Sequence, residues 1–170
     1  KHWSPFEMVS VCMEIETTRD IARQILRHRS FSFQEFSQRY ADPVKELSFV
    51  TREARIQDIK NRQNSLETID LPLKAEWEKK QLELIELAKE TYNWAVSNGI
   101  AKEQARAVLP EGNTVSKLYV NGTLRSWIHY IELRASNGTQ KEHSEIAKAC
   151  AQVISKIAPI IDNKQSGDGI

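Results

Sequence analysis

The sequence predicts a helix-rich α+β fold with a small, mostly antiparallel sheet, and three observations support this class. Five segments carry apolar residues at helical spacing, two shorter segments alternate as strands do, and no internal repeat or low-complexity segment interrupts them. The chain has 170 residues, of which 40% are hydrophobic, so it can bury a core of its own. One domain, or one subunit of an oligomer, is the expected organisation.

The first predicted strand covers residues 7–18 (EMVSVCMEIETT), where apolar and polar residues alternate in part. Thr18 is the expected N-cap of a helix that continues to about His28. One face of this helix is apolar and carries Ile21, Ala22, Ile25 and Leu26. Gln24, Arg27 and His28, spaced i, i+3 and i+4, are expected beside each other on the opposite face.

The middle of the chain predicts a long helix over residues 71–98, which Asn98-Gly99 ends. Its apolar positions at helical spacing are Trp77, Leu84, Ile85, Ala88, Tyr92 and Ala95. A short helix is expected over residues 102–109, before Pro110, and a second strand over residues 113–121 (NTVSKLYVN). Trp94 is expected on a core face.

Two further helices complete the pattern. The first covers residues 122–136, with Leu124, Trp127, Ile128 and Ile131 inward. Arg125 and His129 are four residues apart on another face, and Arg134 lies near the end. The last helix covers residues 141–161 and turns inward Ile146, Cys150, Val153, Ile154 and Ile157.

The charge balance excludes some classes of protein. Lys plus Arg number 24 and Asp plus Glu 23, and a net charge of +1 argues against a protein that wraps duplex DNA. No apolar run reaches the roughly 20 residues of a membrane span, and no signal-peptide pattern is present, so a soluble, cytoplasmic protein is expected. Cys12 and Cys150 form no CxxC pair and are expected to be buried, reduced thiols.

Residues 27–40 (RHRSFSFQEFSQRY) gather cationic and hydroxyl side chains around three phenylalanines. Arginine is favoured where a planar fork must hold a phosphate or a carboxylate, so the cluster indicates a phosphorylated ligand. A solvated surface with carboxylate partners is the alternative. The chain has no GxGxxG fingerprint after a strand and no Walker A, HExxH or GxSxG motif.

The same segment closely resembles the signature of the flavin-dependent thymidylate synthases, in which RHR is followed after seven residues by Ser, then x-Arg. Glu35, two residues before Ser37, and Tyr40, after Arg39, also match. Three further segments resemble the family in the same order: HWSPFEM, ARAVLP and LRSWIHYIELRAS. The resemblance extends over most of residues 2–154.

The resemblance implies an oligomeric enzyme, a homotetramer, that methylates dUMP to dTMP. Methylenetetrahydrofolate supplies the carbon, FAD carries the hydride and NADPH reduces the flavin, without a covalent enzyme nucleophile and without a metal. Subunit junctions form the sites, so that one site draws on more than one chain. Residues 1–162 are then a single catalytic domain that lacks an N-terminal segment, and residues 163–170 a flexible C-terminal tail.

The resemblance also implies roles for individual residues. The FAD-binding set is Ser4, Arg27, His28, Arg29, Glu35, Thr123, Arg125 and His129. The dUMP-binding set is Gln24, Arg27, Glu35, Phe36, Ser37, Gln38, Arg39, Arg106 and Arg134. Arg134 is the expected catalytic residue, because a guanidinium beside the uracil lowers the cost of negative charge on the ring. His2 and Tyr40 match positions near the folate or nicotinamide.

Two other hypotheses use the same residues. A non-catalytic nucleotide- or RNA-binding module would show salt-sensitive binding of long polyanions. A structural helical subunit would use its arginines only for ion pairs across an interface. The near-zero net charge argues against nucleic acid as a partner, and no membrane partner is expected.

Overall fold

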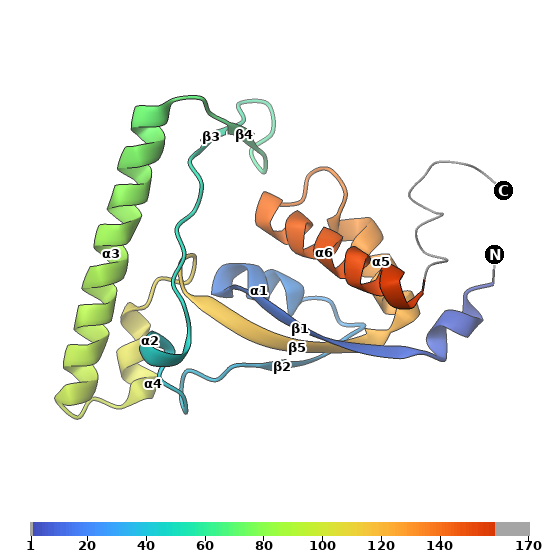
Figure 1. Ribbon diagram of the computed structural model, residues 1–170, viewed down its shortest axis with the longest axis horizontal. Helices are drawn as coiled ribbons and strands as arrows, with labels where there is room; N and C mark the ends of the chain where they lie inside the picture. Colours follow the sequence, from blue (N-terminus) through green and yellow to red (C-terminus); the bar gives the residue numbers. More distant parts are fainter. Residues whose placement is uncertain (1, 159–170) are drawn as a thin grey trace. The chain divides into compact units, whose positions relative to one another are not determined.

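The computed structural model describes residues 2–158, which form helices and small antiparallel sheets (Figure 1). This arrangement confirms the helix-rich α+β class. In chain order the elements are η1 (Ser4–Glu7), β1 (Ser10–Thr18), α1 (Arg19–Ile25), β2 (Ser32–Glu35), α2 (Pro43–Glu46), β3 (Arg55–Gln57), β4 (Ser65–Glu67), α3 (Leu71–Ser97), α4 (Lys102–Ala105), η2 (Arg106–Val108), β5 (Val115–Thr123), α5 (Leu124–Arg134) and α6 (Lys141–Ile157).

The chain divides into two compact units. The described part of the first unit comprises residues 2–13, 28–32 and 120–158, and the second unit comprises residues 14–27 and 33–119. A single catalytic domain over residues 1–162 stays a prediction. The predicted tail, residues 163–170, lies outside the described residues.

The main sheet has the strand order β1-β5-β2. In the first unit the Leu124 amide donates to the Val9 carbonyl at 2.8 Å, and in the second the Arg19 amide donates to the Thr114 carbonyl at 3.0 Å. From residue 9 to residue 19, the hydrogen-bonded partner goes back along the chain from residue 124 to residue 114. Strands β1 and β5 therefore run antiparallel. The predicted strands are thus confirmed, each starting two or three residues later than expected. The sequence interpretation missed β2 and the antiparallel β3–β4 hairpin.

The core of the first unit lies between β1, β5 and the helices α5 and α6, which run side by side (Figure 1). The four residues predicted to face inward on α5 are all buried: Leu124, Trp127, Ile128 and Ile131. Trp127 donates its indole N–H to the Val11 carbonyl at 3.0 Å, which satisfies the polar atom of a fully buried ring. On α6, Cys150 and Ile154 are buried as predicted, whereas Val153 and Ile157 are exposed.

In the second unit, α3 buries one stripe against α4 and η2. Ile85, Ala88, Tyr92 and Ala95 are buried as predicted, but Trp77, Leu84 and Trp94 are 44%, 49% and 62% exposed. Their predicted burial was wrong because the buried stripe takes the polar Gln81 instead. The Gln81 side chain accepts hydrogen bonds from the Arg52 amide at 2.7 Å and from Asn113 Nδ2 at 3.1 Å. Cys12 is also exposed, contrary to expectation.

Helix α1 is shorter than the predicted helix, which extended to about His28, and this corrects the placement of two site residues. α1 ends at Ile25, so Arg27 and His28 do not share a helix face with Gln24. The chain turns after Leu26, and Phe31 reaches a buried position 4.7 Å, between ring centroids, from Trp127. Thr18 does occupy the N-cap position, but its hydroxyl donates to Asp20 Oδ1 at 2.6 Å instead of accepting from the helix.

Gly122 in β5 is required by the ring of Phe31. A Cβ at this position would overlap the Phe31 ring, with 2.7 Å to Cε1. We therefore expect Gly122→Ala to lower the free energy of unfolding by about 1–3 kcal/mol, the usual cost of overpacking. Urea denaturation measures the loss. The matched control is Gly112→Ala, where an added Cβ meets nothing within 4 Å. Equal stability of the two variants would contradict the proposed close approach.

Candidate functional site

A pocket of about 340 Å³ in the second unit brings together two predicted nucleotide-binding residues. We call it the Gln38 pocket, and its lining residues are Arg19, Arg23, Gln38, Glu103, Arg106, Ala107, Leu109 and Glu111. Three guanidinium groups and two carboxylates thus surround the space. Of the residues predicted to bind dUMP, Gln38 and Arg106 line it directly.

Glu111 organises the charged wall of this pocket. Arg23 donates to both of its carboxylate oxygens, at 2.7 and 2.5 Å, and Arg19 Nε lies 4.0 Å from Oε1. The hydrogen bonds from Arg23 lower the pKa of the Glu111 carboxyl, and Glu111 raises the pKa of Arg23. Both groups are therefore charged at neutral pH.

Glu35 lies behind the same wall. Its Oε1 accepts hydrogen bonds from Arg19 Nη1 at 3.3 Å and from the Ser116 hydroxyl at 2.9 Å. The carboxylate thereby holds Arg19, whose side chain is only 13% exposed, at the edge of the pocket. Glu35 thus contacts a pocket-lining residue without lining the pocket itself.

Gln38 carries an unsatisfied polar atom. The residue is 3% exposed, and its Nε2 makes no hydrogen bond within the described residues. A buried donor without a partner costs roughly 1–3 kcal/mol, so such groups usually meet a ligand or water. The Gln38 amide and the arginines of the pocket offer N–H donors to an anion with several oxygens.

Arg39 and Ser37 lie next to the pocket residues. Arg39 forms an ion pair with Glu103 at 3.1 Å, and Arg106 Nε donates to the Glu103 carbonyl at 3.3 Å. The Ser37 hydroxyl accepts a hydrogen bond from the Arg39 amide at 3.4 Å, in a local turn. That contact is typical of a turn residue or an anion ligand and does not activate a nucleophile.

The first unit contains a groove of about 520 Å³. We call it the Arg125 groove, and its lining residues are Trp3, Glu7, Ser30, Arg125, Ser126, His129 and Glu132. Arg125 and His129, predicted to bind FAD, both line it, as their spacing on one helix face implies. Arginine, imidazole and hydroxyl groups beside an indole ring are a donor set that suits a phosphorylated aromatic ligand.

Arg125 is held in place by the N-terminal segment. Its Nη1 donates to Glu7 Oε1 at 2.7 Å, and its guanidinium carbon lies 6.0 Å from the centre of the Trp3 ring. Thr123 is the N-cap of α5, accepting from the Ser126 amide at 3.2 Å, and its hydroxyl lies 3.4 Å from Glu7 Oε2. Thr123 therefore fixes the start of the helix that carries Arg125.

Arg134, the last residue of α5, is anchored within the first unit as well. Its Nε donates to Nε2 of His28 at 2.9 Å. His28 packs edge-on against Tyr130, with ring centroids 5.0 Å apart. The structure thus joins two residues that the sequence interpretation had given separate roles.

The other predicted site residues take varied positions. His2, Ser4, Arg27, Arg29 and Tyr40 are exposed, whereas Gln24 and Phe36 are half-buried. Ser4 begins η1, and the Tyr40 carbonyl accepts from Lys102 Nζ at 3.1 Å. The Phe36 amide donates to the Lys117 carbonyl at 2.8 Å, which extends the pairing of β2.

Sequence reasoning missed several lining residues. Arg19 and Arg23 are four residues apart on α1, and this spacing was a signal that could have paired them. Trp3 and Glu7 lie inside the HWSPFEM segment that was already singled out. Glu103, Glu111, Ser30, Ser126 and Glu132 had no local signal, because elements distant in sequence bring them to their sites.

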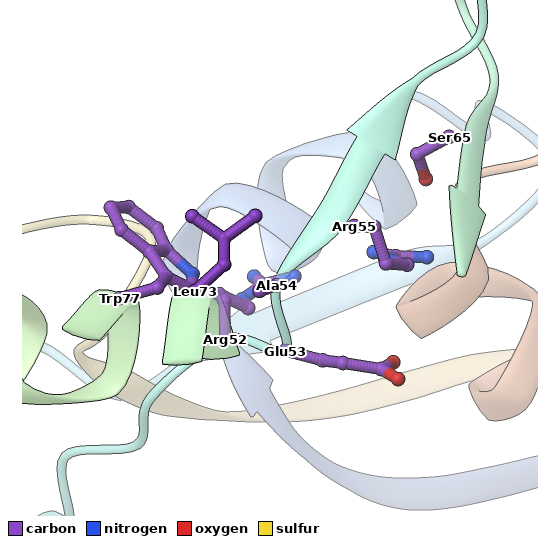
Figure 2. Close-up of a pocket in the computed structure, with 7 residues that line it drawn as sticks. All are labelled: Arg52, Glu53, Ala54, Arg55, Ser65, Leu73 and Trp77. Atoms are coloured by element: carbon purple, nitrogen blue, oxygen red, sulfur yellow. The ribbon is translucent and has the colours of Figure 1, made fainter. Parts of the chain in front are cut away.

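A third hollow, of about 420 Å³, lies beside the β3–β4 hairpin (Figure 2). Its lining residues are Arg52, Glu53, Ala54, Arg55, Ser65, Leu73 and Trp77, none of which was predicted as a site residue. Arg52 forms an ion pair with Asp20 at 2.7 Å and donates to the Gly112 carbonyl at 3.1 Å. Figure 2 shows Leu73 and Trp77 together at the start of α3.

Within residues 2–158 no group of three or more His, Cys, Asp and Glu side chains is placed to hold a metal ion. Over the same range, none of the helices combines the length and the apolar character that crossing a membrane requires.

Comparisons with known proteins agree on one family. The family model described as "Thymidylate synthase complementing protein" matches residues 1–160. The "Probable flavin-dependent thymidylate synthase" of Paramecium bursaria Chlorella virus 1 is 50% identical over 161 residues, which cover 95% of this chain and 73% of the relative. The "Flavin-dependent thymidylate synthase" of Synechocystis sp. is 51% identical over 160 residues, covering 94% and 73%. That of Kosmotoga olearia is 31% identical over 159 residues, covering 94% and 68%.

The Arg23–Glu111 pair predicts a pH-dependent contribution to stability. The pKa of Glu111 is lower in the folded chain than in the unfolded chain, where it is about 4.3. The ion pair therefore stabilises the folded state fully above that pH, and its contribution is lost as the pH falls through the pKa of the folded state. We expect Glu111→Gln to be less stable than wild type at pH 7 by at most about 1 kcal/mol, because both side chains are about half-exposed. Urea denaturation at pH 7 and pH 4 should show the difference shrinking. A stability difference between wild type and Glu111→Gln that grows on acidification would contradict a lowered pKa of Glu111.

Proposed function

Because the chain belongs to the flavin-dependent thymidylate synthase family, we propose that it converts dUMP to dTMP with FAD, NADPH and methylenetetrahydrofolate. The observation that best supports this function is the Gln38 pocket, in which Gln38 of the signature segment and Arg106 of the ARAVLP segment lie with two further arginines. The test is dTMP formation by the purified protein with dUMP, FAD, NADPH and methylenetetrahydrofolate. Binding of dUMP without dTMP formation would favour a non-catalytic nucleotide-binding module.

The Gln38 pocket is the proposed site for the phosphate of dUMP. Four arginines at or beside the pocket (Arg19, Arg23, Arg39 and Arg106) supply positive charge that three carboxylates (Glu35, Glu103 and Glu111) offset only in part. The buried Nε2 of Gln38 gains an acceptor when an anion enters, so part of its desolvation cost is recovered on binding. Ser37 and Arg39 add a hydroxyl and a further guanidinium beside the pocket.

The Arg125 groove is the proposed site for part of FAD. Arg125, His129 and the Ser30 and Ser126 hydroxyls are suitable donors for a diphosphate, and Trp3 offers an aromatic face. The chain's residues bind and orient here, while the flavin, when bound, supplies the hydride chemistry. Arg27, Arg29 and Ser4 remain proposed contacts of the same cofactor, and His2 and Tyr40 proposed contacts of the folate or nicotinamide.

Arg134 is the proposed catalytic residue. Uracil C5 is a poor nucleophile, and a fixed guanidinium beside the ring stabilises the negative charge that activates it. The Nε contact with His28 fixes the orientation of this guanidinium before substrate binds. Ser37 is proposed as a phosphate ligand, and the reaction then needs no covalent bond between the enzyme and C6.

A homotetramer is the proposed assembly. Beside its buried stripe, α3 also carries five large apolar side chains that are each at least 42% exposed: Leu73, Trp77, Leu84, Leu87 and Trp94. Successive members of this set are four, seven, three and seven residues apart, so each spacing is about one or two times 3.5 residues. A period of 3.5 residues is typical of the contact line between two packed helices. A second copy of the chain that covers this stripe would remove several large apolar side chains from water.

A substitution at Gln38 should lower the affinity for dUMP without lowering the free energy of unfolding. Gln38→Met removes an unsatisfied donor while keeping the volume, so the free energy of unfolding should not fall. The affinity for dUMP should decrease about 10- to 100-fold, because one hydrogen bond to the charged phosphate is lost. Calorimetric titration with dUMP and with deoxyuridine, which has no phosphate, measures the effect. A smaller loss for deoxyuridine is expected, and unchanged dUMP affinity would remove Gln38 from the site.

Replacing Arg134 separates chemistry from cofactor binding. Arg134→Ala should lower kcat for dTMP formation by at least about 100-fold, because an electrostatic stabiliser of the transition state is lost. The bound flavin, measured by visible absorption, should remain close to the wild-type amount. Loss of flavin in proportion to activity would instead make Arg134 a cofactor-binding residue.

A charge on the exposed stripe of α3 should weaken self-association. Leu87→Glu places a carboxylate within the stripe, so sedimentation should show smaller species than wild type. Leu82→Glu is the matched control, because Leu82 is 51% exposed but lies half a helical turn away. Equal effects of the two substitutions would argue that α3 does not form the interface.

A further inference from the structure

Four polar and aromatic side chains form a continuous network in the first unit, and only two of them had a predicted role. Arg134 Nε donates to His28 Nε2 at 2.9 Å, and His28 packs edge-on against Tyr130 at 5.0 Å between ring centroids. Tyr130 in turn shares a hydrogen bond of 3.1 Å with Nε2 of His143. The Tyr130 and His143 side chains are 1% and 0% exposed.

The contact with Arg134 determines the protonation of His28. A guanidinium is always charged in proteins, so its Nε–H must be the donor and Nε2 of His28 must carry no proton. The single proton of the neutral ring then lies on Nδ1. A positive imidazole would lose this hydrogen bond and would also be repelled by the guanidinium.

The same contact leaves the two terminal amino groups of Arg134 out of the bond with His28. These groups form the planar fork that can donate two parallel hydrogen bonds to a flat acceptor. The direction of the fork is set by Nε, and hence by the position of the His28 ring. An imidazole that turned or moved would turn the fork with it.

The Tyr130–His143 pair supplies a rigid, uncharged wall for His28. Burial first, and the charge of Arg134 second, lower the pKa of His143 to about 4, and burial raises the pKa of the Tyr130 phenol. Both groups are therefore neutral at physiological pH. Phe31 closes the wall, with its ring centroid 5.9 Å from that of Tyr130 in an edge-on contact.

We propose that His28 positions the Arg134 guanidinium through its unprotonated Nε2, and that the buried Tyr130–His143 pair holds His28 in that orientation. Tyr130 and His143 are thus positioning residues that act through His28, and they need not touch substrate or cofactor. This proposal rests on the proposed function for its effect on dTMP formation, but the state of His28 can be measured without activity.

The first test is ¹⁵N NMR of histidine-labelled full-length protein at neutral pH. The chain has 4 histidines, and single replacements by Gln assign their signals. His28 should be neutral, with its proton on Nδ1, and Arg134→Ala should remove that preference. A protonated His28, or one with its proton on Nε2, would overturn the proposal even if the enzyme proves active.

The second test is steady-state kinetics of His143→Leu, which removes the partner of the Tyr130 hydroxyl. Misplacing a catalytic group by a fraction of an ångström to 1 Å costs up to about 100-fold, so kcat should fall about tenfold or more while the Kd of dUMP and the flavin content stay within about twofold. The double variant Tyr130→Phe/His143→Leu, which leaves no unpaired hydroxyl, should recover part of kcat. Leu133→Ala, at an exposed position of α5, is the control.

A pair of substitutions at His28 completes the test. His28→Gln can offer an oxygen close to the place of Nε2, so it should keep more of kcat, corrected for bound flavin, than His28→Leu. Equal kcat for these two variants, or a His143→Leu protein whose folded fraction has wild-type kcat, would overturn the positioning role. If wild type forms no dTMP, the proposed function fails, and the NMR result still decides the state of His28.

Discussion

The ion pair between Arg23 and Glu111 is the interaction on which the geometry of the Gln38 pocket depends. Glu111 accepts two hydrogen bonds from Arg23, and the Glu111 carbonyl accepts a third, at 3.4 Å, from the Asp20 amide. Helix α1 is therefore fixed to the segment that follows η2, and the pocket between these walls keeps a surplus of guanidinium groups. Three carboxylates, those of Glu35, Glu103 and Glu111, pair with these arginines and reduce the surplus without cancelling it.

In the first unit, a hydrogen bond to a histidine ring orients Arg134. Arg134 contacts a neutral imidazole, not a carboxylate, so its full positive charge remains available to a ligand. Buried neutral groups, Tyr130 and His143, fix that imidazole where a charged partner would have reduced the field. The two arginine sites thus differ: the proposed anion site holds its guanidinium groups among carboxylates, whereas Arg134 donates to an imidazole.

The helices were predictable because their apolar residues recur at helical spacing. The helix ends, and the residues that pack beside each helix, depend on tertiary contacts. The inward face of α5 and the Arg125–His129 pair followed from helical spacing alone. The end of α1 at Ile25 did not, because no Gly, Pro or other local stop signal follows that residue. The contacts of Glu7 and His143 with distant residues had no local signal. Trp77, Leu84 and Trp94 on α3 were predicted to be core because periodicity alone does not show which apolar positions are buried.

The visible absorption spectrum of the purified protein, recorded before and after addition of dUMP, shows whether the protein binds flavin and dUMP in one site. We expect the absorption of oxidised flavin, present on purification or after incubation with FAD, and a change in that band with dUMP but not with RNA. A protein that binds no flavin under either condition would not be a flavin-dependent thymidylate synthase. The arginines of the Gln38 pocket and the Arg125 groove would then serve an anion of another kind.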